Sequence, residues 1–307
     1  LWGNAGDVLR RVRDPRFLPE TLAAAGLRHL PIAMGATGVP TDGSWLRKPI
    51  ASAGGGRISR YVGRDPHDKE TSGRWCYQPF LEGESLSGVF VAAGGECELL
   101  GVSRQLIGEK WTGARDFWYC GSIGPISLSY QAWKTWRTIG EALTRRGGMV
   151  GVFGVDAIVR GDEVWPVEIN PRYPASAEII DVVHRQGIMQ FHMAACAPPQ
   201  LSRQLIRQPL PRIPHIEEVR LCWGKAILFS ERDGTMPSGL PHLSERSEHP
   251  SGQLPILADL PAVKTELHAG EPVLTLFAAG DNDAQVEARL MKRCAEVKKW
   301  LETHGKE

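Results

Sequence analysis

Two apolar segments joined by a short polar turn decide the fold of this chain. Residues 151–159 read Gly-Val-Phe-Gly-Val-Asp-Ala-Ile-Val, and residues 164–170 read Val-Trp-Pro-Val-Glu-Ile-Asn. Both segments are typical of β-strands, in which β-branched and aromatic residues are enriched. Asp156, Glu168 and Asn170 interrupt the apolar pattern with oxygen-bearing side chains. Because Asp and Asn are depleted in strands, we interpret these three residues as functional.

The length of the turn decides whether the three polar side chains share a face. Glu168 and Asn170 are two residues apart, so they leave the same face of their strand. A five-residue turn over 160–164 places Asp156 directly opposite Glu168, and a three-residue turn over 160–162 places the two diagonally. A two-residue turn over 161–162 turns Asp156 to the other face. A shared face therefore predicts a turn with an odd number of residues.

A shared face of carboxylates predicts a metal site. Two buried like charges repel each other unless a positive partner lies between them. Mg²⁺ takes oxygen ligands and commonly shares them with phosphates. We predict that Asp156, Glu168 and Asn170 bind one or two Mg²⁺ ions, for which Mn²⁺ could substitute; the alternative is a polar surface hairpin. The other face of the hairpin is apolar and predicts burial: Val155, Ala157, Val159, Val167 and Ile169.

The composition is that of a globular protein with about two domains. The 307 residues are 42% hydrophobic and 23% charged, and the net charge of +1 provides no field for nucleic acid or membrane. The six cysteines are scattered without a CxxC pair, which argues against zinc and for reduced thiols. We expect a cytoplasmic protein with small-molecule substrates and no nucleic-acid or membrane partner. The sequence is compatible with a homodimer.

The remaining pattern predicts a mixed α+β fold without regular βαβ alternation. We expect helices within 1–30, broken at Pro15, and over 128–146, 174–192 and 283–303. We expect strands over 45–50, 58–62, 75–81, 85–94, 96–105, 219–229 and 272–277. Residues 108–126, which are rich in glycine and aromatic residues, are expected to form a loop.

Two further segments have features that suit a nucleotide. Lys48 is followed by three glycines, Gly54, Gly55 and Gly56, whose backbone amides can surround a phosphate. This segment matches neither the GxxxxGK[ST] loop nor GxGxxG. Residues 75–87 form a strand, a Glu-Gly turn and a second strand. The backbone of such a hinge can bind the edge of a heterocycle, although an ordinary hairpin explains it equally well.

Taken in order, these segments resemble the ATP-grasp superfamily over roughly residues 20 to 195, most specifically at 168–172, Glu-Ile-Asn-Pro-Arg. The resemblance implies an ATP-grasp fold in which two α+β subdomains grip ATP. It divides the chain into a first subdomain at 1–77, a second at 78–200 and a C-terminal α+β extension at 201–307. The reaction that it implies converts a carboxylate to an acyl phosphate, from which an amine displaces phosphate.

The resemblance also implies roles for single residues. Lys48 would contact the phosphates, and the three glycines would cover them as a mobile lid. Arg172 would steady the acyl phosphate, so that Lys48 and Arg172 are the expected catalytic residues. The expected nucleotide contacts comprise a base site and a ribose site: Gln78, Phe80 and Leu81 for adenine, and Glu84 for ribose.

Three departures from the family pattern stand out. The family's second phosphate-binding lysine is missing, because residues 13–17 read Arg-Asp-Pro-Arg-Phe; Arg13 or Arg16 is the candidate substitute. Gly154 stands where many relatives have arginine. The chain begins with Leu1, and we expect that the usual N-terminal domain is absent.

The sequence therefore predicts an ATP- and Mg²⁺-dependent ligase that forms an amide-type C–N bond between a small carboxylic acid and an amine. The whole pattern also resembles ATP-grasp carboligases of pterin- and furan-linked one-carbon metabolism. Two alternatives stay open: a biotin-carboxylase-like enzyme that activates bicarbonate, and an ATP-binding module that has lost catalysis.

Overall fold

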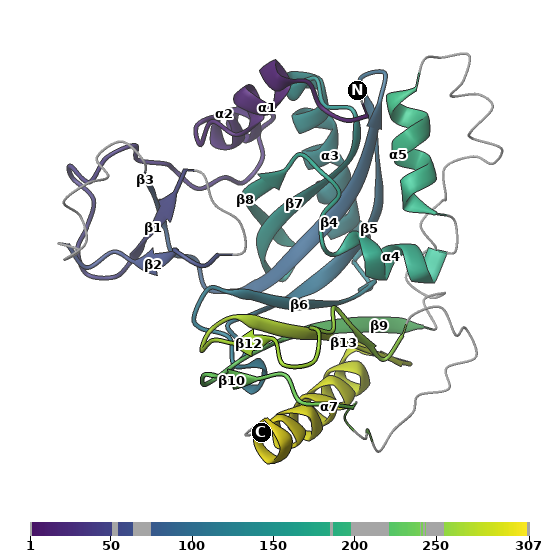
Figure 1. Ribbon diagram of the computed structural model, residues 1–307. Helices are drawn as coiled ribbons and strands as arrows, with labels where there is room; N and C mark the ends of the chain where they lie inside the picture. The colour runs from purple at the N-terminus through teal and green to yellow at the C-terminus, as the bar shows by residue number, and fades with distance from the viewer. Residues whose placement is uncertain are drawn as a thin grey trace.

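The computed structural model describes residues 2–50, 55–63, 75–184, 187–197, 221–239, 241, 243 and 255–305. Figure 1 shows a large sheet with helices on both faces and a small sheet that stands beside it. The fold is mixed α+β with antiparallel sheets, which confirms the predicted fold class.

The large sheet has eight strands in the order β11-β13-β9-β6-β5-β4-β7-β8, and all neighbours are antiparallel. Its strands come from both halves of the chain: β4 (Glu84–Ala93), β5 (Glu96–Ile107), β6 (Tyr119–Gly124), β7 (Gly151–Arg160), β8 (Glu163–Asn170), β9 (Cys222–Phe229), β11 (Leu257–Ala258) and β13 (Pro272–Gly280). The segment expected as a C-terminal extension thus contributes β9, β11 and β13 to the same sheet as the predicted metal hairpin.

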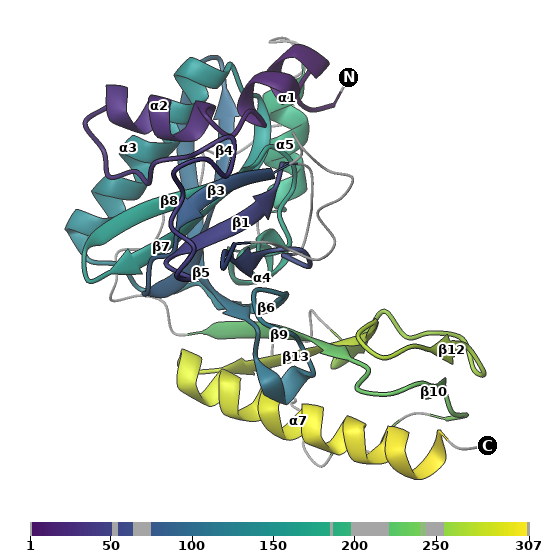
Figure 2. The same ribbon diagram turned by 90° about the vertical axis from the view of Figure 1, so that its left-hand side faces the viewer.

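The small sheet has three strands in the order β2-β1-β3: β1 (Trp45–Pro49), β2 (Ser59–Arg60) and β3 (Trp75–Pro79). In Figure 2 it lies in front of the end of the large sheet that carries β7 and β8. A two-stranded pair, β10 (Gly234–Thr235) with β12 (Glu266–Leu267), lies near the C-terminal helix. The small sheet therefore faces the predicted metal hairpin.

Helices cover both faces of the large sheet. One face packs against three helices, α2 (Phe17–Ala24), α3 (Tyr130–Gly147) and α7 (Asp283–His304). The other face packs against two, α4 (Ala177–His184) and α5 (Ile188–Cys196). The short helix α1 (Gly6–Val12) precedes α2, and a 3₁₀ turn, η2 (Lys110–Thr112), precedes β6. The helix break expected at Pro15 falls between α1 and α2.

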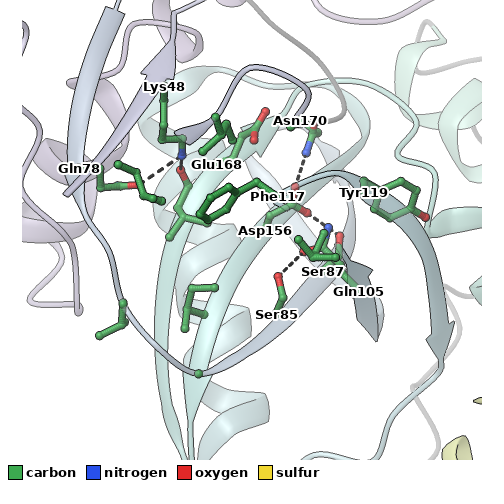
Figure 3. A pocket seen from close by; sticks show the side chains of 18 of the residues that line it. Lys48, Gln78, Ser85, Ser87, Gln105, Phe117, Tyr119, Asp156, Glu168 and Asn170 are labelled. Carbon is green, nitrogen blue, oxygen red and sulfur yellow. Dashed lines mark hydrogen bonds between the residues drawn. The ribbon is translucent and has the colours of Figure 1, made fainter. Parts of the chain in front are cut away.

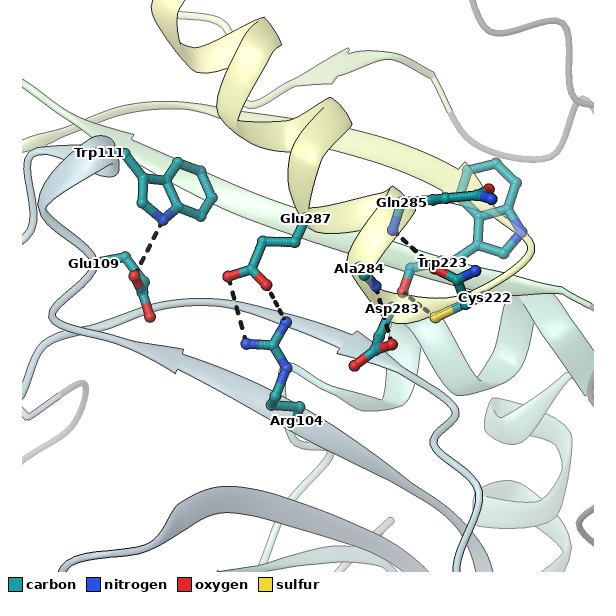
Figure 4. Close-up of polar contacts among 10 residues, drawn as sticks. Arg104, Glu109, Trp111, Cys222, Trp223, Asp283, Ala284, Gln285 and Glu287 are labelled. Atoms are coloured by element: carbon teal, nitrogen blue, oxygen red, sulfur yellow. Dashed lines mark hydrogen bonds and ion pairs between the residues drawn. The ribbon is translucent and has the colours of Figure 1, made fainter.

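Local sequence signals account for α3 and α7. Ser129 caps α3 by accepting a hydrogen bond from the Ala132 amide at 3.0 Å, and Gly148 ends it in the left-handed conformation. Trp136, Ile139 and Leu143, which form its apolar face, are fully buried. Figure 4 shows how α7 is fixed to the sheet: Arg104 of β5 and Glu287 of α7 approach to 2.7 Å.

Two expectations are wrong. The helix expected over 174–192 is two helices, and Gly187, with a φ of +71°, directly precedes α5. The loop expected over 108–126 contains the strand β6, which joins β5 to β9. A Cβ on Gly121 would lie 2.1 Å from the Lys225 carbonyl oxygen, so glycine is required where β6 meets β9. A glycine that looks like a turn residue in the sequence is here a site of close strand approach.

None of the helices among the described residues has the length and apolar character needed to cross a bilayer.

Candidate active site

The turn of the β7–β8 hairpin does not have the predicted odd number of residues. Arg160 pairs with Glu163, so the turn has two residues, Gly161 and Asp162, and not an odd number. Asp156 nevertheless lies directly opposite Glu168. The register shifts between the pairs Asp156–Glu168 and Ala157–Pro166, which leaves Val167 as an extra residue in β8. This β-bulge offsets the one-residue slip that a two-residue turn would otherwise cause.

Pro166 accounts for the place of the bulge. Proline has no backbone N–H to donate, and within sheets it occurs on edge strands or at bulges. β8 is the edge strand of the large sheet, so the ladder can be interrupted there. The carbonyl of Val167, released from the regular ladder, accepts a hydrogen bond from Lys48 Nζ at 3.2 Å. The bulge therefore sets the carboxylate register and also binds the lysine.

A cavity of about 570 Å³ lies between the small sheet and the large sheet (Figure 3). Along one face of β7, Val152 is buried under α5 in the core. Asp156 and Ile158 lie further along the same face and line the cavity instead. The same sheet face thus serves as core under the helices and as cavity floor beneath the small sheet.

Lys48 connects the two sheets across the cavity. It lies on β1 of the small sheet, and besides Val167 its Nζ donates to Gln78 Oε1 of β3 at 3.3 Å. Figure 3 shows the ammonium group projecting toward the strand that carries Glu168. The structure therefore brings the two residues Lys48 and Gln78 to the carboxylate pair, although they lie about a hundred residues away in the sequence.

The Asp156 carboxylate is enclosed by polar partners. Ser87 Oγ donates to Asp156 Oδ1 at 2.8 Å, and Asn170 Nδ2 donates to Oδ2 at 3.0 Å. Burial, and after it the neighbouring Glu168 charge, raise the pKa of Asp156 to about 6, although these hydrogen bonds and one from Gln105 lower it. A cation between the two carboxylates would remove this repulsion.

The donor set fits a hard divalent cation. Asp156, Glu168 and Asn170 offer two carboxylates and an amide, and all three line the cavity. Among the described residues, no group of three or more His, Cys, Asp or Glu side chains forms a complete metal site. Mg²⁺ commonly uses one or two protein carboxylates and completes its shell with phosphate and water. The residues present fit such a shared site.

Arg172 is held beside this site by neutral acceptors. Its Nη2 donates to Asn170 Oδ1 at 3.3 Å and its Nη1 to the Tyr173 carbonyl at 3.2 Å. The Asn170 amide thus links Asp156 to Arg172. The guanidinium is exposed toward the cavity and keeps donors for an anion.

Asn4 fixes the loop between Asn170 and Arg172. Its Nδ2 donates to the Pro171 carbonyl at 3.2 Å, and its Oδ1 accepts from the Val150 amide at 2.8 Å. One amide side chain near the start of the chain therefore ties the predicted metal and arginine segment to the beginning of β7.

The opposite end of the cavity is the predicted hinge, and it is largely apolar. Phe80 and Leu81 line it together with Ile107 and Phe117, and the rings of Phe80 and Phe117 meet edge to face at 6.4 Å. Glu84 is not among the described residues that line the cavity, whereas Glu82 is. The hinge and the carboxylate pair therefore lie at two ends of one cavity.

The glycine segment reaches the cavity at Gly55. Gly54 lies outside the described residues. Gly56 does not line the cavity, and a Cβ built on it would lie 3.7 Å from Trp118 Nε1. Gly55 has a φ of +75°, and a Cβ there would lie 2.0 Å from the Phe117 carbonyl oxygen. Only glycine fits this close backbone contact.

Sequence reasoning missed several cavity residues. Ser85 and Ser87 are two apart in a predicted strand, so the alternation that linked Glu168 to Asn170 could have indicated them. Phe117, whose φ is +66°, and Asn4 carried no local signal. Of the two candidate substitutes for the missing lysine, Arg16 is hydrogen-bonded to Asp14 at 3.1 and 3.0 Å, whereas Arg13 lines a neighbouring cavity.

Residues 22–176, about half of the chain, match the family model of the ATP-grasp domain. The chain belongs to the ATP-grasp family. The ATP-grasp resemblance read from the hairpin, the lysine and the hinge is thereby confirmed.

Solved structures show the same ATP-grasp fold. An L-amino acid ligase from Bacillus licheniformis superposes with a TM-score of 0.70 at 12% identity, covering 96% of this chain and 73% of the ligase. The biotin carboxylase domain of 2-oxoglutarate carboxylase from Hydrogenobacter thermophilus, solved with MgADP and bicarbonate, gives a TM-score of 0.59 at 13% identity over 91% of this chain and 64% of that one.

A curated relative matches only a part of the chain. Formate-dependent phosphoribosylglycinamide formyltransferase from Burkholderia mallei is 34% identical over 77 residues, which is 25% of this chain and 19% of that protein. The matched segment thus spans about a fifth of the length of the relative.

Proposed function

We propose that this ATP-grasp protein is an ATP- and Mg²⁺-dependent ligase that joins a small carboxylic acid to an amine and releases ADP and phosphate. One observation carries the proposal. Lys48 faces the Asp156–Glu168 pair across a single cavity, with Arg172 beside it. This arrangement suits phosphoryl transfer, in which catalysis consists of positioning reactants and neutralising negative charge.

The two ends of the cavity support an orientation for ATP. The apolar hinge end suits adenine, with the backbone of Phe80 and Leu81 and the side chain of Gln78 along its edge. Glu82 is our candidate for the ribose hydroxyls, in place of the expected Glu84. Lys48 and Gly55 then lie along the phosphates, which reach the carboxylate end.

Asp156, Glu168 and Asn170 would hold the divalent cation. When bound, the ion supplies neutralisation of the phosphate charge. The Asn170 amide currently donates to Asp156 through its nitrogen, so a role for its oxygen as ligand requires a rotation of the amide. That rotation would also release Arg172 from Asn170 Oδ1.

Arg172 is the candidate for anchoring the carboxylate end of the acid. In the proposed reaction a carboxylate oxygen attacks the γ-phosphorus, and the bond to the β–γ bridging oxygen breaks as ADP leaves. The amine nitrogen then attacks the acyl carbon, phosphate leaves, and the nitrogen loses a proton to solvent. A guanidinium suits both steps, because its planar fork matches carboxylate and phosphate oxygens.

A coupled ADP-release assay over acids and amines, with mass spectrometry of the products, tests the proposal. The formate-dependent relative supports including formate and other one-carbon acids. ADP release that needs both an acid and an amine, together with an amide product, is the expected result. ADP release with bicarbonate alone would indicate a carboxylase-type activation instead. Nucleotide binding without turnover over the whole panel would indicate a module without catalysis.

A further inference from the structure

A second cavity, of about 580 Å³, adjoins the first one. The two share a wall that includes Lys48, Glu168 and Arg172. The far wall of the second cavity consists of α1 and the segment after it, and includes Arg10 and Arg13. Figure 1 shows α1 and α2 above β8, on the side away from the hinge. A molecule in the second cavity would therefore reach Arg172 from the side opposite to the adenine end.

Basic residues outnumber acidic ones among the described residues that line this cavity, which include Arg10, Arg13, Lys48 and Arg172 but only Asp14 and Glu168 as carboxylates. Within the described part of the chain, the guanidinium groups of Arg10 and Arg13 make no hydrogen bond or ion pair. Asp14, which also lines the cavity, is hydrogen-bonded to Arg16, and these bonds lower the pKa of Asp14. Among the described residues, Arg172 is hydrogen-bonded only to neutral oxygens, those of Asn170 and Tyr173.

The neighbouring Arg11, in contrast, has partners within the protein. Its Nη1 donates to the Gly147 carbonyl at 3.1 Å, and its Nη2 lies 3.9 Å from Asp7. The helix dipole favours basic residues in the last turn of α1, which applies to Arg10 and Arg11 alike. Arg10 and Arg13 differ from Arg11 because they line a cavity and have no hydrogen-bonded or ion-paired partner among the described residues.

From this difference we infer that the acid substrate carries a second anionic group, a carboxylate or a phosphate, that Arg10 and Arg13 bind while Arg172 lies beside the reacting carboxylate. The inference rests on the proposed ligase function and narrows its substrate class. One arginine suffices for a single carboxylate, since one guanidinium binds it with two parallel hydrogen bonds. The two further arginines then match a further anion at the other end of the same cavity.

The test compares matched acids that differ by one anionic group. Glutarate and butyrate form one pair, and phosphoglycolate and glycolate form the other; each acid is titrated calorimetrically into the protein with MgADP. We expect at least one acid with two anionic groups to bind about tenfold more tightly than its partner with one, because two partly exposed ion pairs are added. Arg10→Gln with Arg13→Gln should abolish this preference, and Arg11→Gln should leave it unchanged.

Three outcomes would overturn the inference. One is equal or undetectable binding of the two acids in both pairs. Another is a preference that survives in the Arg10→Gln, Arg13→Gln double variant. The last is a double variant whose ATP affinity falls while its acid affinity does not, which would place the arginines on the nucleotide. Failure of the ligase proposal would look different, because the wild-type protein would then release no ADP with any acid and amine.

Discussion

The large sheet contains two hairpins that each have a β-bulge, and the two bulges have different roles. β4–β5 turns at Gly94 and Gly95, and β7–β8 turns at Gly161 and Asp162. Each hairpin then has one extra residue in its second strand. In β4–β5 the pairs Val89–Gly101 and Phe90–Leu99 leave Leu100 unpaired, and in β7–β8 the unpaired residue is Val167.

The surroundings decide what each bulge does. β5 lies inside the sheet between β4 and β6, and Leu100 is 1% exposed in the core beneath α4 and α5. β8 is an edge strand, so Val167 lies open to the cavity and its carbonyl reaches Lys48. The bulge within the sheet thus adds a buried side chain to the core, whereas the bulge at the edge adds a backbone carbonyl to the site. The predictions below test that difference.

The largest effect is expected from Glu168→Gln, which removes one negative charge from the carboxylate pair without changing its size. We expect ADP formation to fall by roughly 10²–10³-fold, as for the loss of one preorganised charge contact in other enzymes. The measurement is steady-state ADP release, with circular dichroism to verify the fold. Glu163→Gln on the same strand is the control, since Glu163 pairs with Arg28 at the surface. Turnover within tenfold of wild type in Glu168→Gln would refute the metal assignment.

Deletion of Leu100 should affect stability. The ladder then continues regularly from Phe90–Leu99 to Val89–Gly101, but a fully buried leucine is lost from the core. By analogy with large-to-small core substitutions, we expect a loss of about 2–5 kcal/mol in the free energy of unfolding. Urea denaturation followed by fluorescence measures it. A loss below about 1 kcal/mol would show that this bulge contributes little to the core.

Deletion of Val167 should affect nucleotide binding instead. Without it, the two-residue turn continues in register, and Asp156 still lies opposite Glu168 on the cavity face. Lys48 loses the carbonyl that accepts from it, so we expect ATP affinity to fall about tenfold, typical of a hydrogen bond to a charged group. The stability loss should be smaller than for the Leu100 deletion.

A double-mutant cycle sharpens this prediction. Lys48→Met alone should weaken ATP binding, and deletion of Val167 should add little in the Lys48→Met background, since the two changes remove the same contact. Isothermal titration calorimetry gives all four affinities. Additive effects would mean that the bulge acts on the nucleotide by another route.

The smallest effect is expected from Asn4→Asp. The aspartate keeps an acceptor for the Val150 amide but has no hydrogen to donate to the Pro171 carbonyl. We expect kcat to fall about fivefold, as for the loss of roughly 1 kcal/mol of hydrogen bonding, with an unchanged KM for ATP. Asn4→Ala, which loses both bonds, should have the larger effect. A change in thermal stability without a change in kcat would show that Asn4 is structural only.

Much of the fold was predictable because its signals are local. The alternation of β7 and β8, the Ser129 cap and apolar face of α3 and the helix α7 follow from residues a few positions apart. Strand β6 was not predictable in this way. Glycine is required at position 121 because the Lys225 carbonyl, about a hundred residues later in the sequence, approaches it closely. The break between α4 and α5 was missed although Gly187 is a helix-ending signal, because apolar residues continue on both sides of it.

The sequence by itself determined that Asp156, Glu168 and Asn170 are oxygen donors within apolar strands, since strand alternation is a property of adjacent residues. Their meeting was decided by the tertiary structure: a two-residue turn would have separated them, and the Val167 bulge at the sheet edge realigned them. Lys48, Ser87 and Asn4 reached the same site through contacts between distant segments. Such contacts depend on how sheets and loops pack, and no short-range pattern in the sequence encodes them.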